Sequence, residues 1–203
     1  MDIPQHPPLI LASSSAYRQA LLSRLRLPFQ HQAPDLDETP LDGEAPAALA
    51  VRLALAKAQA IFNRHPDAIV IGSDQVAELD GQPLGKPGDH ARAVQQLQAM
   101  QGRTLVFHTA LAVLSPTHAP LQRNVPTTCR MRPLSPREIE AYLRADTPYD
   151  CAGSAKIESL GACLLDTVES ADPTALIGLP LLTLNQFLLT LGMNPLLALE
   201  GNA

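Results

Sequence analysis

The stretch Ala68-Ile69-Val70-Ile71-Gly72-Ser73-Asp74-Gln75 decides the fold, because three polar residues directly follow an uninterrupted apolar run. A short run that is rich in β-branched residues and lacks polar alternation is typical of a strand buried on both faces of a sheet. We expect this strand to end at Ser73-Asp74-Gln75, where the core meets solvent, and strand structure to resume over 76–79. A carboxylate held there costs stability unless it is paired or functional. Asp74 is therefore the first candidate site residue.

Elements on both sides of this strand follow from turn, capping and periodicity signals. Upstream we expect a strand over 9–12, a polar turn at 13–15, a helix from Tyr17, a strand over 27–32, an exposed acidic loop over 34–40 and a helix over 45–63. Downstream we expect a tight turn at Asp80-Gly81, a helix over 89–100 and a hairpin of 104–114 with 121–131. A capping box at 135–138 predicts a helix that begins there and runs to about 145. After it we expect a strand over 162–168, a helical turn opened by Asp172-Pro173 and a helix over 181–191 closed by Gly192. This loose alternation predicts an α/β fold: a mixed, twisted sheet flanked by helices, with two lobes around a central cleft.

Composition excludes several classes of protein. The 203 residues carry 15 Lys+Arg against 20 Asp+Glu, a formal charge of −5, which argues against a protein that coats nucleic acid. With 3% aromatic residues and no Trp, the core must be aliphatic, and a platform that stacks single-stranded bases is not expected.

Cysteine usage and the N-terminal segment bear on location. Cys129, Cys151 and Cys163 are odd in number and form no Cys-x-x-Cys pair, so neither a disulfide framework nor a zinc site is indicated, and a cytoplasmic setting is expected. The segment 1–8 lacks the basic and apolar regions of a signal peptide, and no run of 18 apolar residues occurs. We expect no membrane span.

Three groups of polar residues could carry chemistry. The first is Ser13, Ser15 and Arg18, at an expected strand-to-helix junction where free N–H groups and a guanidinium favour an anion. The same serines are also typical of ordinary helix N-caps.

The second group is Asp37-Glu38 together with Asp74. Carboxylates that converge on a cleft can hold Mg²⁺ or Mn²⁺, and one left free can deprotonate water. An acidic loop such as 34–40 is equally typical of a solvated surface segment.

The third group is Lys57 and Lys86, each of which has the alternative of an ordinary surface lysine. Gly85-Lys86-Pro87 is not a Walker A loop, because the preceding glycine, Gly81, is one residue too close and Pro87 replaces the Ser/Thr that binds Mg²⁺. Cys151 has no identifiable base nearby in sequence and is interpreted as packing.

Together these motifs resemble the Maf family of nucleoside triphosphate pyrophosphatases over nearly the whole chain. The motifs that occur in the family's order are residues 11–18 (Leu-Ala-Ser-Ser-Ser-Ala-Tyr-Arg), Asp37-Glu38-Thr39, Lys57-Ala58, residues 72–76 (Gly-Ser-Asp-Gln-Val), Gly85-Lys86-Pro87, residues 151–154 (Cys-Ala-Gly-Ser) and Gly178-Leu179-Pro180. Within the family the chain is most similar to the branch that hydrolyses 7-methyl-GTP, on the basis of Tyr17, Gln75 and the segment 154–158. The resemblance implies a single Maf/ITPase-like domain over 1–203.

The resemblance also implies a reaction and a set of roles. Water attacks a nucleoside triphosphate to give the monophosphate and pyrophosphate, with a divalent cation as cofactor. Asp74 would be the general base, and Glu38, in preference to Asp37, would join Asp74 in binding the metal. The remaining roles are phosphate binding by Ser13, Ser15, Arg18, Lys57 and Lys86, and base specificity from Tyr17, Gln75 and Glu158.

Two other functions stay open at this point. One is hydrolysis of dTTP or UTP, the activity of the sister branch, which typically has Thr at the position of Gln75. The other is a nucleotide-binding regulator of cell division without turnover. The family further suggests a homodimer, with a nucleoside triphosphate as the ligand. The charge balance and the lack of a long apolar run predict neither a nucleic acid polymer nor a membrane as partner.

Overall fold

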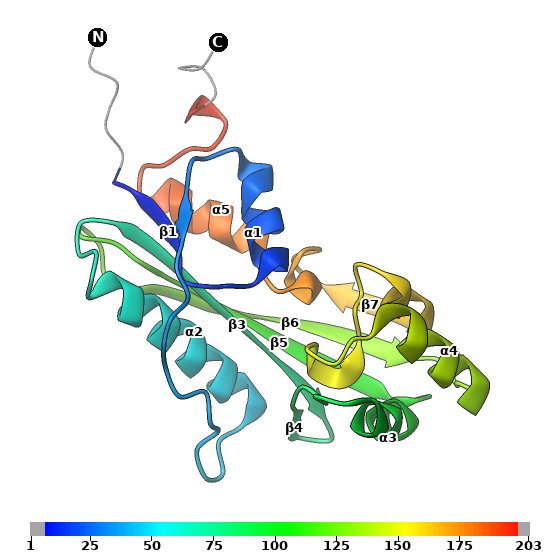
Figure 1. The fold of residues 1–203 in the computed structure, drawn as a ribbon. Helices are drawn as coiled ribbons and strands as arrows, with labels where there is room; N and C mark the ends of the chain where they lie inside the picture. Colours follow the sequence, from blue (N-terminus) through cyan, green and yellow to red (C-terminus); the bar gives the residue numbers. More distant parts are fainter. Residues whose placement is uncertain (1–6, 199–203) are drawn as a thin grey trace.

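A seven-stranded mixed sheet forms the centre of the protein, which we describe from a computed structural model over residues 7–198. Its strand order is β2-β1-β3-β5-β6-β7, with β4 pairing additionally with β3. The pairs β1–β2 and β1–β3 are parallel and the others are antiparallel (Figure 1). The predicted mixed α/β sheet is thereby confirmed.

The elements have the following bounds. The strands are β1 Leu9–Leu11, β2 Gln30–His31, β3 Ile69–Leu79, β4 Gln82–Leu84, β5 Thr104–Leu114, β6 Leu121–Met131 and β7 Leu165–Ser170. The α-helices are α1 Ala16–Leu22, α2 Pro46–Phe62, α3 His90–Met100, α4 Pro136–Asp146 and α5 Leu181–Thr190. The 3₁₀ turns are η1 Ser23–Leu25, η2 Ala152–Ser154, η3 Leu160–Leu164 and η4 Ala175–Ile177.

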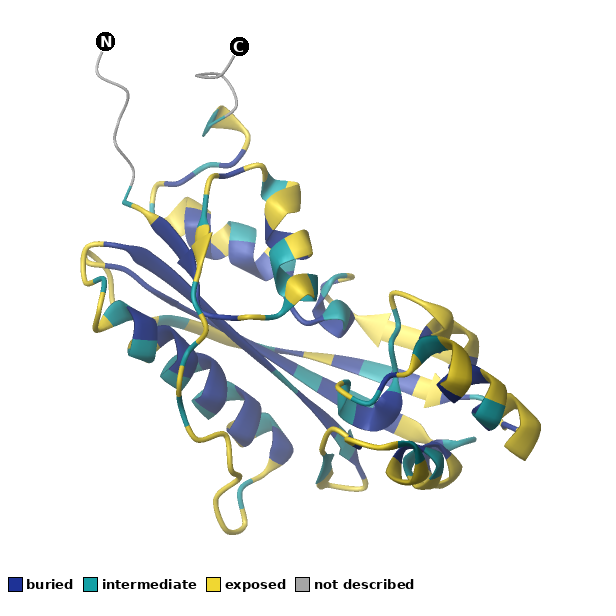
Figure 2. Cartoon of the chain, in the orientation of Figure 1, coloured by how far each residue is buried: buried dark blue, intermediate teal, exposed yellow. Residues whose placement is uncertain are grey.

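Successive residues of β3 face opposite sides of the sheet, and this alternation assigns the helices to layers. Val70 and Val76 pack with α2 on one face. Ile69 and Ile71 lie on the other face and pack with α1 and α5. Ala77 lies on that same face, further along the strand, and packs with α3 and α4. The helices α1 and α5 form one group and α3 and α4 form another, on the same face of the sheet and over its opposite ends. These two groups are the predicted two lobes. Figure 2 shows β3 buried over nearly its whole length, whereas β7 is largely exposed.

Gly72 brings α2 unusually close to β3. A Cβ atom at this position would lie 2.2 Å from the Ala54 carbonyl oxygen and 2.7 Å from the Ala58 backbone nitrogen. Both atoms belong to the backbone of the helix and cannot be moved by changing a rotamer. A residue without a side chain is therefore required where helix and strand meet.

Several boundaries agree with the sequence analysis. The two strands of the hairpin, β5 and β6, have the predicted bounds. The capping box at the start of α4 is present, since the Ser135 hydroxyl accepts from the Glu138 N–H and the Glu138 carboxylate accepts from the Ser135 N–H. Gly192 follows α5 with φ +78°, the left-handed conformation that ends many helices.

Three predicted boundaries were wrong. The strand expected over 27–32 is only Gln30–His31, because Leu27 turns into the core instead of pairing. The strand expected over 162–168 begins at Leu165, after the 3₁₀ turn η3. The buried strand does not end at Ser73: β3 continues to Leu79, so Asp74 lies inside a strand.

Two sequence observations concern the ends of the chain and membranes. The segment 1–8, interpreted above as lacking signal-peptide features, lies for the most part outside the described residues. Among residues 7–198, no helix combines the length and apolar character needed to cross a bilayer.

Candidate active site

A cleft of about 850 Å³ opens where β3 lacks a strand partner on one edge. On that edge, β1 pairs with β3 only as far as Ile71 and β4 pairs only from Ala77 onward. The residues of β3 between these points line the cleft, together with the loop that follows β1 and the loop that follows β4. Its size is that of a small-molecule site.

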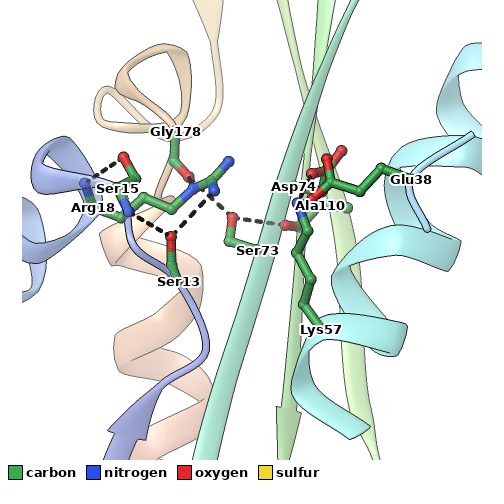
Figure 3. A network of polar contacts seen from close by, with 9 residues as sticks. All are labelled: Ser13, Ser15, Arg18, Glu38, Lys57, Ser73, Asp74, Ala110 and Gly178. Carbon is green, nitrogen blue, oxygen red and sulfur yellow. Dashed lines mark hydrogen bonds and ion pairs between the residues drawn. The ribbon is translucent and has the colours of Figure 1, made fainter. Parts of the chain in front are cut away.

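An ion cluster of one ammonium and two carboxylates lies on this strand edge (Figure 3). The Lys57 Nζ is 2.5 Å from the Asp74 Oδ1 and 2.9 Å from the Glu38 Oε1. Lys57 and Asp74 are buried, whereas the Glu38 side chain is half exposed. Among the described residues, none donates a hydrogen bond to the Asp74 Oδ2, so this oxygen is free to accept one from a ligand or a water.

Burial raises the pKa of Asp74 above its ordinary value, although the charges of Lys57 and Arg18 oppose the shift. A carboxylate with a raised pKa has a stronger tendency to take up a proton. This environment suits a general base.

The two acidic residues of the predicted loop have different surroundings. The Asp37 Oδ1 accepts hydrogen bonds from the Thr39 N–H at 2.9 Å and from the Thr39 hydroxyl at 2.6 Å, an Asx turn. Arg52 adds a bond to the Thr39 carbonyl at 3.2 Å, which ties the loop to α2. Of the pair, Glu38 therefore reaches the ion cluster, and Asp37 stabilises the turn.

Ser13, Ser15 and Arg18 also lie together at the cleft, in the loop between β1 and α1 and at the start of that helix. Ser15 is the N-cap, its hydroxyl accepting from the Arg18 N–H at 3.4 Å, so the alternative interpretation as a cap applies to this residue. The Ser13 hydroxyl accepts from the Ser15 N–H at 3.1 Å and from the Arg18 Nη1 at 3.5 Å. Because α1 has only seven residues, the guanidinium is the main source of positive charge here.

Arg18 lies beside the ion cluster and is held by a backbone carbonyl. Its Nε donates to the Gly178 oxygen at 2.9 Å. Burial lowers the pKa of Arg18, and the negative charges of Asp74 and Glu38 oppose that shift. A guanidinium stays protonated in proteins, so it supplies a fixed positive charge.

The two lysines differ from each other in a way that the sequence did not indicate. Lys57 is buried within α2, with 6% of its surface exposed, so the surface alternative is wrong for it. Lys86 is exposed and lines the opposite side of the cleft, in the loop after β4. Within the described part of the chain it forms no ion pair.

Tyr17, Gln75 and Glu158, the predicted specificity residues, all line the cleft. The Tyr17 ring centroid lies 5.7 Å from the Lys156 Nζ, and hydrogen bonding to the Tyr17 side chain raises the pKa of Lys156. Sequence reasoning missed this pair, because the contact joins two lobes that are far apart in the chain.

Gln75 is engaged with the protein rather than free in the cleft. Its Nε2 lies 2.9 Å from the Thr109 hydroxyl oxygen and 3.0 Å from each of the carbonyl oxygens of Ala175 and Leu176. An amide nitrogen carries two hydrogens, so these three acceptors use its donors fully.

Cys151 also lines the cleft. Burial raises the pKa of its thiol to about 12, which keeps it protonated and removes its nucleophilic form.

Comparison with known proteins gives the following similarities. Residues 8–191 match the family model described as "Maf-like protein". The chain is 58% identical over 192 residues to "7-methyl-GTP pyrophosphatase" from Bordetella avium, covering 95% of this chain and 97% of that protein. It is 56% identical over 191 residues to the protein of the same description from Thiobacillus denitrificans, covering 94% and 95%. Among solved structures, the Staphylococcus aureus Ham1 protein aligns with a TM-score of 0.45 and 15% identity, over 61% of this chain and 71% of that one.

Proposed function

The chain belongs to the Maf family, and from this premise we propose that it is a nucleoside triphosphate pyrophosphatase that hydrolyses 7-methyl-GTP to 7-methyl-GMP and pyrophosphate. The relatives at 56–58% identity carry that description over nearly their full length. The observation that carries the proposal in this chain is the cleft itself, which is lined by a buried carboxylate with one free oxygen and by three cationic side chains.

In the reaction, a water oxygen bonds to the α-phosphorus and the bond from this phosphorus to the bridging oxygen of the β-phosphate breaks. Pyrophosphate leaves with the electrons of that bond. The Asp74 Oδ2 takes the proton of the attacking water, because the other carboxylate oxygen is bonded to Lys57.

The three cations act on the negative charge of the triphosphate. Arg18 offers a planar set of donors that matches phosphate oxygens, and Lys86 adds an ammonium from the other side of the cleft. Lys57 places a further positive charge beside Asp74. Fixed charges in a partly dry cleft stabilise a transition state better than water does, because they need no reorganisation.

A divalent cation fits the residues present. Mg²⁺ is usually held in proteins by one or two carboxylates together with substrate phosphates. Glu38 and Asp74 are such a pair, and among the described residues no group of three or more potential metal ligands occurs, so the phosphates would complete the coordination. Bound there, Mg²⁺ or Mn²⁺ would neutralise negative charge on the phosphates.

Recognition of the base rests on the Tyr17 ring and Glu158. Methylation at N7 gives guanine a positive charge, and the Tyr17 ring already attracts one cation, the Lys156 ammonium. We infer that the ring attracts 7-methylguanine in the same way once Lys156 moves aside. The Glu158 carboxylate can accept hydrogen bonds from the N1 and N2 donors of guanine.

A substrate panel tests the proposal. The purified protein is given 7-methyl-GTP, GTP, dTTP, UTP and CTP in turn with Mg²⁺ or Mn²⁺, and released pyrophosphate is measured. We expect kcat/KM for 7-methyl-GTP to be at least about tenfold above the others. A preference for dTTP or UTP would assign the sister activity instead, and tight nucleotide binding without pyrophosphate release would favour a regulator.

A further inference from the structure

We propose that Ser73 and Gly178 are positioning residues for Arg18: they hold its guanidinium at a fixed place beside the strand that carries Asp74. The role of Arg18 as a phosphate ligand rests on the function proposed above. Neither Ser73 nor Gly178 is itself expected to contact the phosphates.

The Gly178 carbonyl oxygen is the point at which the two side chains meet. It accepts from the Arg18 Nε at 2.9 Å and lies 3.0 Å from the Ser73 hydroxyl, whose one hydrogen is shared between this oxygen and the Ala110 carbonyl oxygen. Figure 3 shows the three residues converging from α1, from β3 and from the segment after η4. One carbonyl oxygen thereby contacts both the arginine side chain and the serine side chain.

Glycine is required at position 178 by its conformation. Its φ is +113°, which residues with a side chain rarely adopt, and a Cβ atom would lie 3.5 Å from the Arg18 Nε. Turning the peptide to relieve this strain would move the carbonyl that Arg18 uses. The chain can therefore present this oxygen to a guanidinium only with glycine here.

Ser73 links the same oxygen to the central sheet. Its side chain is completely buried, and its hydroxyl lies 2.9 Å from the Ala110 carbonyl oxygen on β5 and 3.0 Å from that of Gly178. Because Ser73 directly precedes Asp74 and both residues pair with β5, the central sheet holds the two residues in the same way.

The segment that carries Gly178 is fixed at its other end by two further side chains. The Thr109 hydroxyl donates to the Ala175 carbonyl at 2.9 Å, and Gln75 donates to the carbonyls of Ala175 and Leu176. Alternate residues of β3, Ser73 and Gln75, thus bond to consecutive parts of one loop. In this arrangement Gln75 acts on the loop, rather than on a base, through its donors.

A bond at Nε has a specific effect on an arginine. It fixes the plane of the guanidinium and leaves the two terminal nitrogens available to the ligand. One of these nitrogens, Nη1, also donates to the Ser13 hydroxyl. Bidentate contacts to phosphate depend on that plane, and misplacement of a charged group by about 1 Å can lower a rate by about 10²-fold.

A double-mutant cycle distinguishes positioning from simple structural support. We compare Ser73→Ala, Arg18→Lys and the double variant for kcat/KM with 7-methyl-GTP and for binding of inorganic pyrophosphate by calorimetry. Arg18→Lys keeps the charge but lacks the Nε–H and the planar fork. We expect Ser73→Ala to lower both quantities about tenfold in the wild-type background and less than about twofold in the Arg18→Lys background.

Unfolding temperatures and a control variant complete the experiment. Loss of a buried hydroxyl should lower the unfolding temperature in both backgrounds, so kcat/KM and pyrophosphate binding are compared per folded molecule. A difference between the backgrounds then reports on Arg18 and not on the amount of folded protein. Ser115→Ala removes another buried hydroxyl, which accepts from the His118 N–H at 3.2 Å far from the cleft, and should leave kcat/KM within about twofold. Ser73→Cys, of similar volume, replaces Ser73→Ala in the cycle if the alanine variant does not fold.

Equal losses of kcat/KM and of pyrophosphate binding in the two backgrounds would overturn the positioning role. Absence of pyrophosphate release from every triphosphate by the wild type would instead refute the proposed function. The binding cycle would then still decide whether Ser73 acts through Arg18.

Discussion

Replacing Asp74 by Asn separates catalysis from stability, and the structure sets the direction of both effects. The exchange is nearly isosteric and removes only the basicity and the charge. Loss of a general base lowers turnover by about 10²- to 10⁴-fold, which corresponds to about 3–5 kcal/mol in the activation barrier. We expect a fall of this size in kcat for pyrophosphate release from 7-methyl-GTP.

Stability should not fall in the same variant. Breaking a buried ion pair commonly costs about 3–5 kcal/mol, because the remaining charge is stranded. Here Lys57 keeps a second carboxylate, since the Glu38 Oε1 is 2.9 Å from its Nζ. Moreover, the pKa of Asp74 is raised on folding, chiefly by burial, so its ionised form is less favourable in the folded than in the unfolded chain at neutral pH. Asn at position 74 removes that cost, and the unfolding temperature should stay the same or rise.

The assay measures pyrophosphate release, nucleotide binding by calorimetry and thermal unfolding for the wild type, Asp74→Asn and Asp37→Asn. Asp37 loses the same charge nearby, but its carboxylate is engaged in its own turn, which Asn also supports, so kcat should change less than about twofold. A kcat for Asp74→Asn within about tenfold of the wild type would refute the assignment of the base. A loss of activity that merely follows a loss of folded protein would refute the separation of the two effects.

Three further predictions follow from other parts of the structure. Gly72→Ala should lower the free energy of unfolding by about 1–3 kcal/mol and kcat by about 10²-fold, because a Cβ atom 2.2 Å from the Ala54 oxygen displaces α2. An unchanged kcat per folded molecule would contradict this. The bond from the Ser135 hydroxyl lowers the pKa of Glu138 to about 2 from 4.5, so its contribution to stability is present above pH 4.5 and is lost as the pH falls toward 2. The difference in unfolding free energy between wild type and Glu138→Gln should therefore shrink over that range, and a difference independent of pH would be the opposite result. Without nucleotide, the Lys57→Met variant should bind Mn²⁺ more tightly than the wild type, because an ammonium no longer bridges the Glu38 and Asp74 carboxylates. The control is Lys86→Met, because Lys86 contacts neither carboxylate. Equal tightening in the control would show a general charge effect instead.

Elements with a local signal were predicted well. The hairpin of β5 and β6 and the capping box of α4 depend on residues close together in the chain, and both were correct. A strand was predicted at β2, but its short length and the late start of β7 were not, because the pairing of both depends on partners distant in sequence. For the same reason, the run at 69–72 indicated a buried strand but not its continuation through Asp74, since β5 stabilises the polar half by pairing with it.

The candidate site was predictable as a set of residues and not as an arrangement. The ordered motifs predicted Ser13, Arg18, Glu38 and Asp74 as site residues, and all four line the cleft. The functions of Ser73 and Gly178 could not be inferred, because each depends on a hydrogen bond between residues about 100 or more positions apart.

The sequence by itself determined the chemical inventory: an α/β fold with a buried strand, four acidic and three basic candidate residues, and a net charge of −5. The tertiary structure alone decided how they are used. It buried Lys57 between two carboxylates, left one Asp74 oxygen free, and tied Arg18 to the central strand through a glycine carbonyl. The physical reason is that periodicity and capping are local properties of the chain. Burial and hydrogen bonds between distant segments exist only once the sheet and its lobes have formed, and burial is what raises the pKa of Asp74.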